Sequence, residues 1–231
     1  MKWIAQSFNC KTIDKHISIQ PIILILNFHS HNAQGDFLKK EIIDLLKDLE
    51  GKDAGERVKG LPSSLRMRNI TPDVGLFLNI LVKATKATSI LEIGTSNGYS
   101  TIWLGLATQE NNGQLITLEV DSRKVKMAKE NLEKAGLVNT VKLIEGDAKE
   151  TLRILDKKFD FVFLDAEKED YLEFFHLIFP KLKIGGVIVA DNVISHAEDL
   201  KEYVDYVRAN PNTQSVLVPI GRGEELTLRI R

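Results

Sequence analysis

Cysteine is almost absent from this chain of 231 residues, which contains only Cys10. A single cysteine excludes an intramolecular disulfide and a cysteine-rich metal site. Low cysteine content is also typical of proteins that work in a reducing compartment, so we expect a cytoplasmic protein.

An excess of charge of one sign is lacking as well. The chain has 31 Lys and Arg residues against 32 Asp and Glu residues, for a formal net charge of −1. This balance argues against a surface that binds nucleic acid broadly, while it still allows a local basic patch.

Long hydrophobic runs are missing too, because no segment approaches the roughly 20 apolar residues that a membrane-spanning helix needs. The nearest candidate, residues 17–28, follows three lysines as a secretory signal would, but Asp14 and Gln20-Pro21 interrupt it and no good cleavage site follows. We therefore predict no membrane association. Residues 1–34 are interpreted as an N-terminal appendage and residues 35–231 as the functional domain.

Strand-like and helix-like segments alternate regularly from Ser89 onward. This alternation predicts an α/β domain with a mostly parallel sheet and helices on both faces. Because only a short glycine-containing turn separates the last two strands, the last strand should run antiparallel. The predicted strands are 90–93, 114–119, 141–145, 159–165, 186–191, 215–220 and 226–230, and the predicted helices are 99–108, 122–135, 148–155, 171–182 and 197–209.

Two further helices are predicted before the sheet and would form an N-terminal helical cap. Residues 36–50 have an amphipathic pattern, and residues 51–60 look like a polar connection. The second helix should begin at Thr71-Pro72, with Thr71 as the cap and Pro72 in the first helical position. The fold class is therefore a Rossmann-like sheet of seven strands with this cap.

The stretch Ser89–Thr101, S-I-L-E-I-G-T-S-N-G-Y-S-T, predicts a strand, a tight glycine turn and a helix start. Such a turn lets the backbone approach a ligand closely. Glu119 follows Gly94 at about the spacing at which an acid reaches a ribose hydroxyl, although the second glycine of the dinucleotide-binding pattern is absent. Asp147 fits two roles equally well, as a partner of an adenine edge or as a helix cap.

Oxygen-bearing side chains also follow the fourth and fifth predicted strands, where Asp165 ends one strand and Asp191 and Asn192 end the next. The carboxyl ends of parallel strands meet at one edge of a sheet, so these side chains should lie close together. Two carboxylates and an amide oxygen suit a hard divalent cation such as Mg²⁺. The alternative is that Asp165 caps a helix and Asp191-Asn192 forms a turn.

Five segments carry a resemblance to a known family: LEIGTSNGYST, LEVDSRKVKMAKENLEKAGL, EGDA, FVFLDAEKEDY and GGVIVADNV. In this order they resemble the cation-dependent S-adenosylmethionine O-methyltransferases, which include catechol and caffeoyl-coenzyme A O-methyltransferases. The resemblance covers roughly residue 60 to the C-terminus. It implies that S-adenosylmethionine and a divalent cation are the cofactors, and it allows a homodimer.

Matched residue by residue, the resemblance implies a role for each position of the motifs. The implied contacts to the methionine part of the cofactor are Glu92, Gly94, Ser96, Tyr99 and Ser100, those to the ribose and adenine are Glu119, Asp147 and Ala148, and Asp165 also belongs to the cofactor site. The implied metal ligands are Asp165, Asp191 and Asn192. Lys168 matches the general base, for which a solvated helix lysine is the alternative, and for His196 a loop or capping role is favoured.

Three functions remain open. The first is methyl transfer to a hydroxyl of a catechol-like small molecule, with a cation that orients the acceptor. The second is methylation of a tRNA hydroxyuridine, for which the basic segment 57–68 would have to face the cofactor. The third is a non-catalytic nucleotide-binding module, which would need neither the metal ligands nor Lys168. The charged loop 221–225 and the short loop after Asn192 depart from the plant enzymes, so their acceptor specificity is not transferred.

Overall fold

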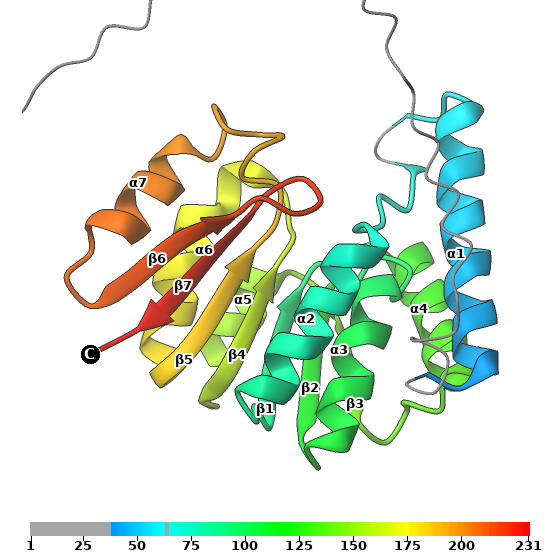
Figure 1. Ribbon diagram of the computed structural model, residues 1–231, viewed down its shortest axis with the longest axis horizontal. Coiled ribbons are helices and arrows are strands. Elements are labelled where there is room, and N and C mark those ends of the chain that lie inside the picture. The colour runs from blue at the N-terminus through cyan, green and yellow to red at the C-terminus, as the bar shows by residue number, and fades with distance from the viewer. Residues whose placement is uncertain (1–37, 63–64) are drawn as a thin grey trace, which may run out of the picture. The chain divides into compact units, whose positions relative to one another are not determined.

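One mixed sheet organises the computed structural model, which describes residues 38–62 and 65–231 (Figure 1). Its order is β3-β2-β1-β4-β5-β7-β6. Strands β1 to β5 run parallel, and β7 pairs antiparallel with both β5 and β6. The strands are β1 (Ser89–Ile93), β2 (Gln114–Glu119), β3 (Val141–Glu145), β4 (Phe159–Leu164), β5 (Leu182–Ala190), β6 (Thr213–Val218) and β7 (Glu224–Arg229).

Both predictions about the sheet are confirmed, since it is mostly parallel and its last strand in the chain is antiparallel. The turn between β6 and β7 is too short for the crossover that a parallel pair requires. The predicted appendage of residues 1–34 lies outside the described residues.

Helices cover both faces of the sheet. Residues of β1 and β4 alternate between two hydrophobic clusters, so that Ile90 and Phe161 face one cluster and Leu91 and Val162 face the other. The first cluster includes residues of α1 (Lys40–Val58), α2 (Pro72–Ala84), α3 (Tyr99–Glu110) and α4 (Ser122–Lys134). The second includes residues of α5 (Ala148–Ile154), α6 (Tyr171–Ile178) and α7 (Lys201–Ala209).

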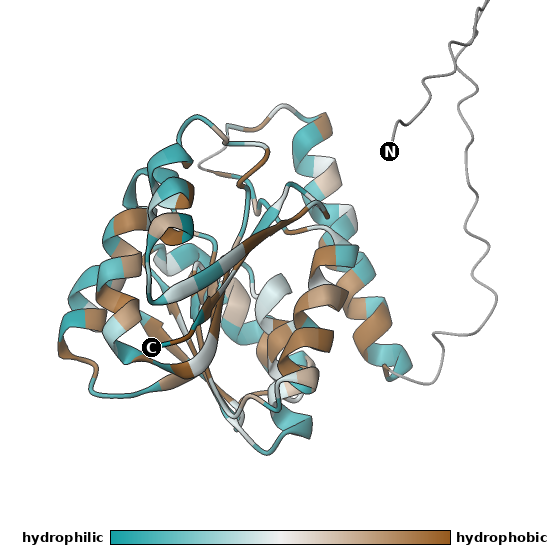
Figure 2. Cartoon of the chain, turned by 60° about the vertical axis from the view of Figure 1, so that its left-hand side comes forward, coloured by the Kyte–Doolittle hydropathy of each residue, from teal (hydrophilic) through white to brown (hydrophobic). Residues whose placement is uncertain are grey.

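The central strands are apolar because they are covered on both sides. Figure 2 shows this pattern, with hydrophobic residues concentrated on the inner strands and hydrophilic residues on the outer faces of the helices. Trp103, Phe174 and Phe175 are buried and belong to these clusters. Within the described ranges, no helix combines the length and the apolar character needed to cross a membrane.

Helix α1 differs from its prediction, because it begins at Lys40 and continues to Val58 through the segment expected to be a connection. Gly51 and Gly55 lower helix propensity, but long-range contacts override this preference. Asp53 is buried and accepts a hydrogen bond from the side chain of Arg57 (2.8 Å) within the same helix. It also accepts one from the backbone of Asn69 (3.4 Å), which lies beyond it in the chain.

Other caps and boundaries also differ from their predictions. Pro72 occupies the first turn of α2 as predicted, but the Thr71 hydroxyl bonds to the carboxylate of Asp73 and makes no cap to the backbone. Helix α6 ends at Ile178 and a 3₁₀ turn, Phe179–Lys181, follows, because Pro180 cannot continue the α-helical hydrogen bonds. Strand β5 therefore starts at Leu182, earlier than predicted, and α7 starts at Lys201, later than predicted.

Candidate active site

A cavity of about 450 Å³ lies at the edge of the sheet where the parallel strands end. Each of the five parallel strands contributes a residue that directly follows it or lies within two positions of its end, and the turn before β7 contributes one more. These residues are Gly94, Glu119, Asp147, Asp165, Asn192 and Arg222. The fold thus brings the two groups of polar residues singled out in the sequence into one cavity.

Backbone hydrogen bonds beyond the strands fix the relative positions of these ends. The Gly94 amide donates to Leu118 (3.0 Å), the Asp165 amide donates to Ile93 (3.0 Å), and the Asp191 amide donates to Leu164 (3.1 Å). The sheet ladder therefore continues into the site and holds it on rigid backbone.

The glycine turn approaches β4 very closely. Gly94 has a φ of +99°, and a Cβ atom built on it would lie 2.0 Å from the carbonyl oxygen of Asp165. Only glycine combines this conformation with this contact. The backbones of Gly94 and Asp165 are therefore in direct contact.

Glu119 holds the turn in place. One of its carboxylate oxygens accepts a hydrogen bond from the Ser96 amide (2.7 Å), and the other accepts from the amides of Val120 (3.0 Å) and Asp121 (2.9 Å). The Ser96 hydroxyl donates to the carbonyl of Met67 (2.7 Å). Glu119, Ser96 and Met67 all line the cavity.

Glu92, Tyr99 and Ser100 lie beneath the turn and are not among the residues that line the cavity. The hydroxyls of Ser100, Thr101 and Thr117 each donate to the Glu92 carboxylate at 2.6 Å. Burial raises the pKa of Glu92 to about 7, against the lowering effect of these three hydrogen bonds.

Tyr99 donates from its hydroxyl to Glu50 of α1 (2.6 Å) and so ties the turn to the N-terminal helix. The structure thus gives Glu92, Tyr99 and Ser100 a network under the turn, and their contact with a cofactor stays a prediction.

Asp147 caps a helix, which was one of its two predicted roles. Its carboxylate accepts from the amides of Lys149 (2.6 Å) and Glu150 (3.2 Å) in the first turn of α5. Asp147 and Ala148 also line the cavity, so the cap does not remove Asp147 from the site.

The other end of the cavity is acidic. Asp165 and Asn192 line it, whereas Asp191 directly precedes Asn192 in the chain and is not among the lining residues. Asp191 and Asn192 are almost fully buried, and Asn192 has a φ of +73°, which is uncommon for a residue other than glycine. Burial first, and then the charge of Asp165, raises the pKa of Asp191. The Asn192 side-chain nitrogen is buried without a hydrogen-bond partner among the described residues.

A further carboxyl group, Glu224 at the start of β7, is fully buried beside these acids. In the described part of the chain, no nitrogen or hydroxyl group donates to either of its oxygens, and its polar neighbour is the carboxyl group of Asp191. Burial and the neighbouring charge of Asp191 raise the pKa of Glu224. Sequence reasoning noted Glu224 only as part of a charged loop, because burial cannot be recognised from two adjacent glutamates.

Lys168 begins a 3₁₀ turn (Lys168–Asp170) and reaches back to the end of β4. Its Nζ donates to Asp165 Oδ1 (3.0 Å), to the carbonyl of Ala166 (2.9 Å) and to the hydroxyl of Tyr171 (2.9 Å). Its side chain is only 12% exposed, which excludes the alternative of a solvated helix lysine.

Tyr171 was not singled out in the sequence. Its hydroxyl is within 3.2 Å of the backbone oxygens of both Leu164 and Asp191, so it bridges the ends of β4 and β5.

Arg68 and Glu167 form a second pair that the sequence did not predict. Arg68 Nη2 lies 2.7 Å from Glu167 Oε1, and both residues line the cavity. They are 99 positions apart in the chain, so only the fold reveals this ion pair. His196 also lines the cavity, and its ring pairs with Asp199 (3.0 Å).

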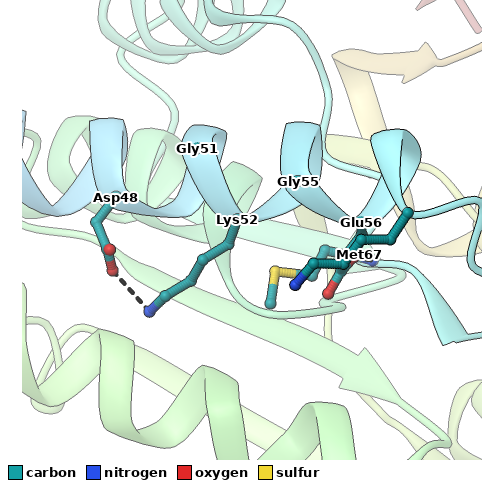
Figure 3. A pocket seen from close by; sticks show the side chains of 7 residues that line it. Asp48, Gly51, Lys52, Gly55, Glu56 and Met67 are labelled. Carbon is teal, nitrogen blue, oxygen red and sulfur yellow. Dashed lines mark hydrogen bonds and ion pairs between the residues drawn. The ribbon is translucent and has the colours of Figure 1, made fainter.

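A second cavity of about 410 Å³ lies along α1, where Figure 3 shows Lys52 paired with Asp48. Met67 lines both cavities. The second cavity is also lined by Lys59 of the basic segment 57–68, but by none of the predicted catalytic, cofactor-binding or metal-binding residues.

Comparisons with known proteins agree with this geometry. The model of a family described as O-methyltransferase matches residues 54–230. The chain is 40% identical over 138 residues to a catechol O-methyltransferase of Niastella koreensis, an alignment that spans 58% of this chain and 62% of that protein. It is 30% identical over 182 residues to caffeoyl-CoA O-methyltransferase 1 of Arabidopsis thaliana, which spans 68% of this chain and 70% of that protein.

A solved structure shares the fold. The O-methyltransferase of Bacillus cereus in complex with SAH superimposes with a TM-score of 0.70 and 26% identity, and the match covers 80% of this chain and 90% of that one. With the family match over most of the chain and the strand-end cavity in place, the chain belongs to the O-methyltransferase family.

Proposed function

We propose that this chain transfers a methyl group from S-adenosylmethionine to one hydroxyl of a catechol-like small molecule. The observation that carries the proposal is the single cavity in which the glycine turn and Glu119 meet Asp165, Lys168 and Asn192. The names of the catechol and caffeoyl-CoA relatives and the SAH-bound neighbour support it.

The methyl donor would lie against the glycine turn. Gly94 leaves the backbone open to close approach, and Ser96, Glu119, Asp147 and Ala148 line the adjoining wall. The Glu119 oxygen that accepts only from the Ser96 amide retains acceptor capacity for a ribose hydroxyl, whereas the other oxygen already accepts two hydrogen bonds. Glu92, Tyr99 and Ser100 would act on the methionine part from beneath the turn.

The residues at the acidic end fit a divalent cation. Asp165, Asp191 and Asn192 supply two carboxylates and an amide, which are hard oxygen donors. Within the described ranges, no three His, Cys, Asp or Glu side chains form a metal site by themselves, so the amide of Asn192 is needed in this set. When bound, a cation supplies charge stabilisation for an ionised hydroxyl and orients two vicinal oxygens.

Lys168 would accept the proton of the reacting hydroxyl at Nζ. Its three hydrogen bonds to Asp165, Ala166 and Tyr171 use all three protons of an ammonium group, so the amine must first lose one. Tyr171 would act as a positioning residue, since its hydroxyl holds the amine near the ends of β4 and β5.

A small-molecule acceptor is favoured over tRNA. Two cations of the basic segment are engaged within the protein, Arg57 with Asp53 and Arg68 with Glu167. The relatives reported above are named for catechol and caffeoyl-CoA.

The proposal is tested by methyl transfer from labelled S-adenosylmethionine to catechol, with Mg²⁺ and with a chelator. We expect chelation, Asp165→Asn and Lys168→Met each to lower the rate at least about 100-fold. Lys201→Met, at an exposed ion pair with Asp205, serves as the matched lysine control and should retain activity.

Three results would contradict different parts of the proposal. Activity that survives chelation would refute the role of the cation. Full activity of Lys168→Met would refute the role of Lys168 as general base. If calorimetry shows that the cofactor binds but no catechol is methylated, the proposal that the acceptor is a catechol is refuted.

A further inference from the structure

Arg222 occupies a distinctive position in the cavity. It lies in the turn between β6 and β7 and lines the cavity together with Asp165, Lys168 and Asn192. Because β7 runs antiparallel, its first residues lie at the same edge of the sheet as the last residues of β5. Arg222 therefore belongs to the acidic, acceptor-binding end of the cavity.

The backbone of this turn is anchored to the segment that follows Asn192. The Arg222 carbonyl accepts hydrogen bonds from the amides of Ile194 (3.0 Å) and Ser195 (3.1 Å). Gly223 has a φ of +93°, and a Cβ atom on it would lie 2.4 Å from the Ile194 side chain. The guanidinium thus extends from a fixed point next to the proposed metal ligands.

The other cations at this end already have anionic partners. Arg68 pairs with Glu167 (2.7 Å), and Lys168 pairs with Asp165 (3.0 Å). Lys149, further along the wall, pairs with Asp170 (2.6 Å).

Arg222 has no ion pair or side-chain hydrogen bond with any residue in the described part of the chain. Lys124 is the other lining cation without an ion pair in the described part of the chain, but it belongs to α4 and its charge acts on Glu167, which already pairs with Arg68. The acceptor end therefore has a guanidinium available to a ligand. A guanidinium presents parallel N–H donors that match the two oxygens of a carboxylate.

We propose that Arg222 binds a carboxylate group of the acceptor, so that the preferred substrates are catechols that carry a carboxylate. This inference rests on the proposed function, which places the two hydroxyls at Asp165 and Asn192. It assigns Arg222 as a residue that determines substrate specificity, and it predicts that the preferred substrate is negatively charged. The ammonium-bearing catechols should be disfavoured, because the same guanidinium repels them.

The test compares kcat/KM for 3,4-dihydroxybenzoate, catechol and 3,4-dihydroxybenzylamine. In Arg222→Ala we expect the ratio of dihydroxybenzoate to catechol to fall roughly 10- to 100-fold, the usual effect of losing a charge-assisted hydrogen bond. Arg222→Lys should recover part of the ratio. Lys124→Ala removes the other unpaired cation and should leave the ratio within about twofold, because Lys124 belongs to α4 and not to the turn before β7, and its ammonium lacks the parallel donors of a guanidinium.

Equal changes for all three substrates in Arg222→Ala, or an equal effect of Lys124→Ala, would overturn the inference. If the wild-type protein methylates none of the three, the proposed function fails separately. Calorimetric binding of dihydroxybenzoate to the protein with S-adenosylhomocysteine then decides the inference. Weaker binding to Arg222→Ala by the same factor supports it, and unchanged binding overturns it.

Discussion

Replacing Gly94 by alanine tests whether the glycine turn and the end of β4 form one rigid unit. The new Cβ would lie 2.0 Å from the carbonyl oxygen of Asp165, and ordinary contact begins at 3.4 Å. A separation of 3.4 − 2.0 = 1.4 Å would therefore have to open between two backbone segments. No side-chain rotation can relieve this contact.

The expected loss of stability has two parts. The φ of +99° strains any residue with a Cβ atom, at a cost of about 1–2 kcal/mol. Displacement of packed backbone adds about 1–3 kcal/mol. Gly98→Ala is the matched control, because its φ is +89° but its Cβ would lie 3.5 Å from Ala128, an ordinary contact. Gly98→Ala should therefore show only the cost of the positive φ, without the cost of displaced backbone.

Urea unfolding of the wild type and both variants measures the difference directly. We expect Gly94→Ala to be less stable than Gly98→Ala by at least about 1 kcal/mol. Because the displaced atom belongs to Asp165, calorimetry should also show weaker binding of S-adenosylmethionine and Mg²⁺ to Gly94→Ala than to Gly98→Ala. Equal stability of the two variants would refute the reasoning, since the backbone contact would then offer no resistance.

Two further predictions concern buried carboxyl groups. Burial raises the pKa of Glu92 from 4.5 to about 7, so the unfolded chain releases this proton first and stability should fall by about 3 kcal/mol as the pH rises from 4.5 to 7. Glu92→Gln should lack this part of the decline in urea melts over the same range, and parallel profiles would contradict the assignment. Glu224 is buried beside the charge of Asp191, and no nitrogen or hydroxyl group in the described part of the chain donates to it, so Glu224→Leu should raise the melting temperature in cation-free buffer by about 2–4 °C. Glu225 is equally buried but receives two hydrogen bonds from Arg208 (2.7 and 2.6 Å), so Glu225→Leu should lower the melting temperature; a decrease for both variants would count against the distinction.

Much of the fold was predictable because its signals are local. Apolar strands alternate with amphipathic helices along the chain, and a short turn before the last strand allows only an antiparallel pair. Helix α1 was the clearest error, since Gly51 and Gly55 suggested a connection. The contacts of Asp53 with Arg57 and Asn69 show how packing overrides a weak local preference.

Part of the candidate site was also predictable from local signals, and part was not. Gly94, Glu119, Asp165 and Asn192 could be singled out because each follows a predicted strand, and the ends of parallel strands share one edge of the sheet. The network beneath the turn could not be predicted, because hydrogen bonds to Glu92 depend on which side chains the packed helix presents to it.

By itself, the sequence determined which residue types follow each strand and therefore that a polar, oxygen-rich edge exists. The tertiary structure decided which of these groups have partners: Lys168 is held by Tyr171, Arg68 is paired with Glu167, and Arg222 lines the cavity without an ion pair in the described part of the chain. The physical reason is that pairing and burial depend on contacts between residues far apart in the chain. Such contacts exist only once the sheet has placed the strand ends side by side.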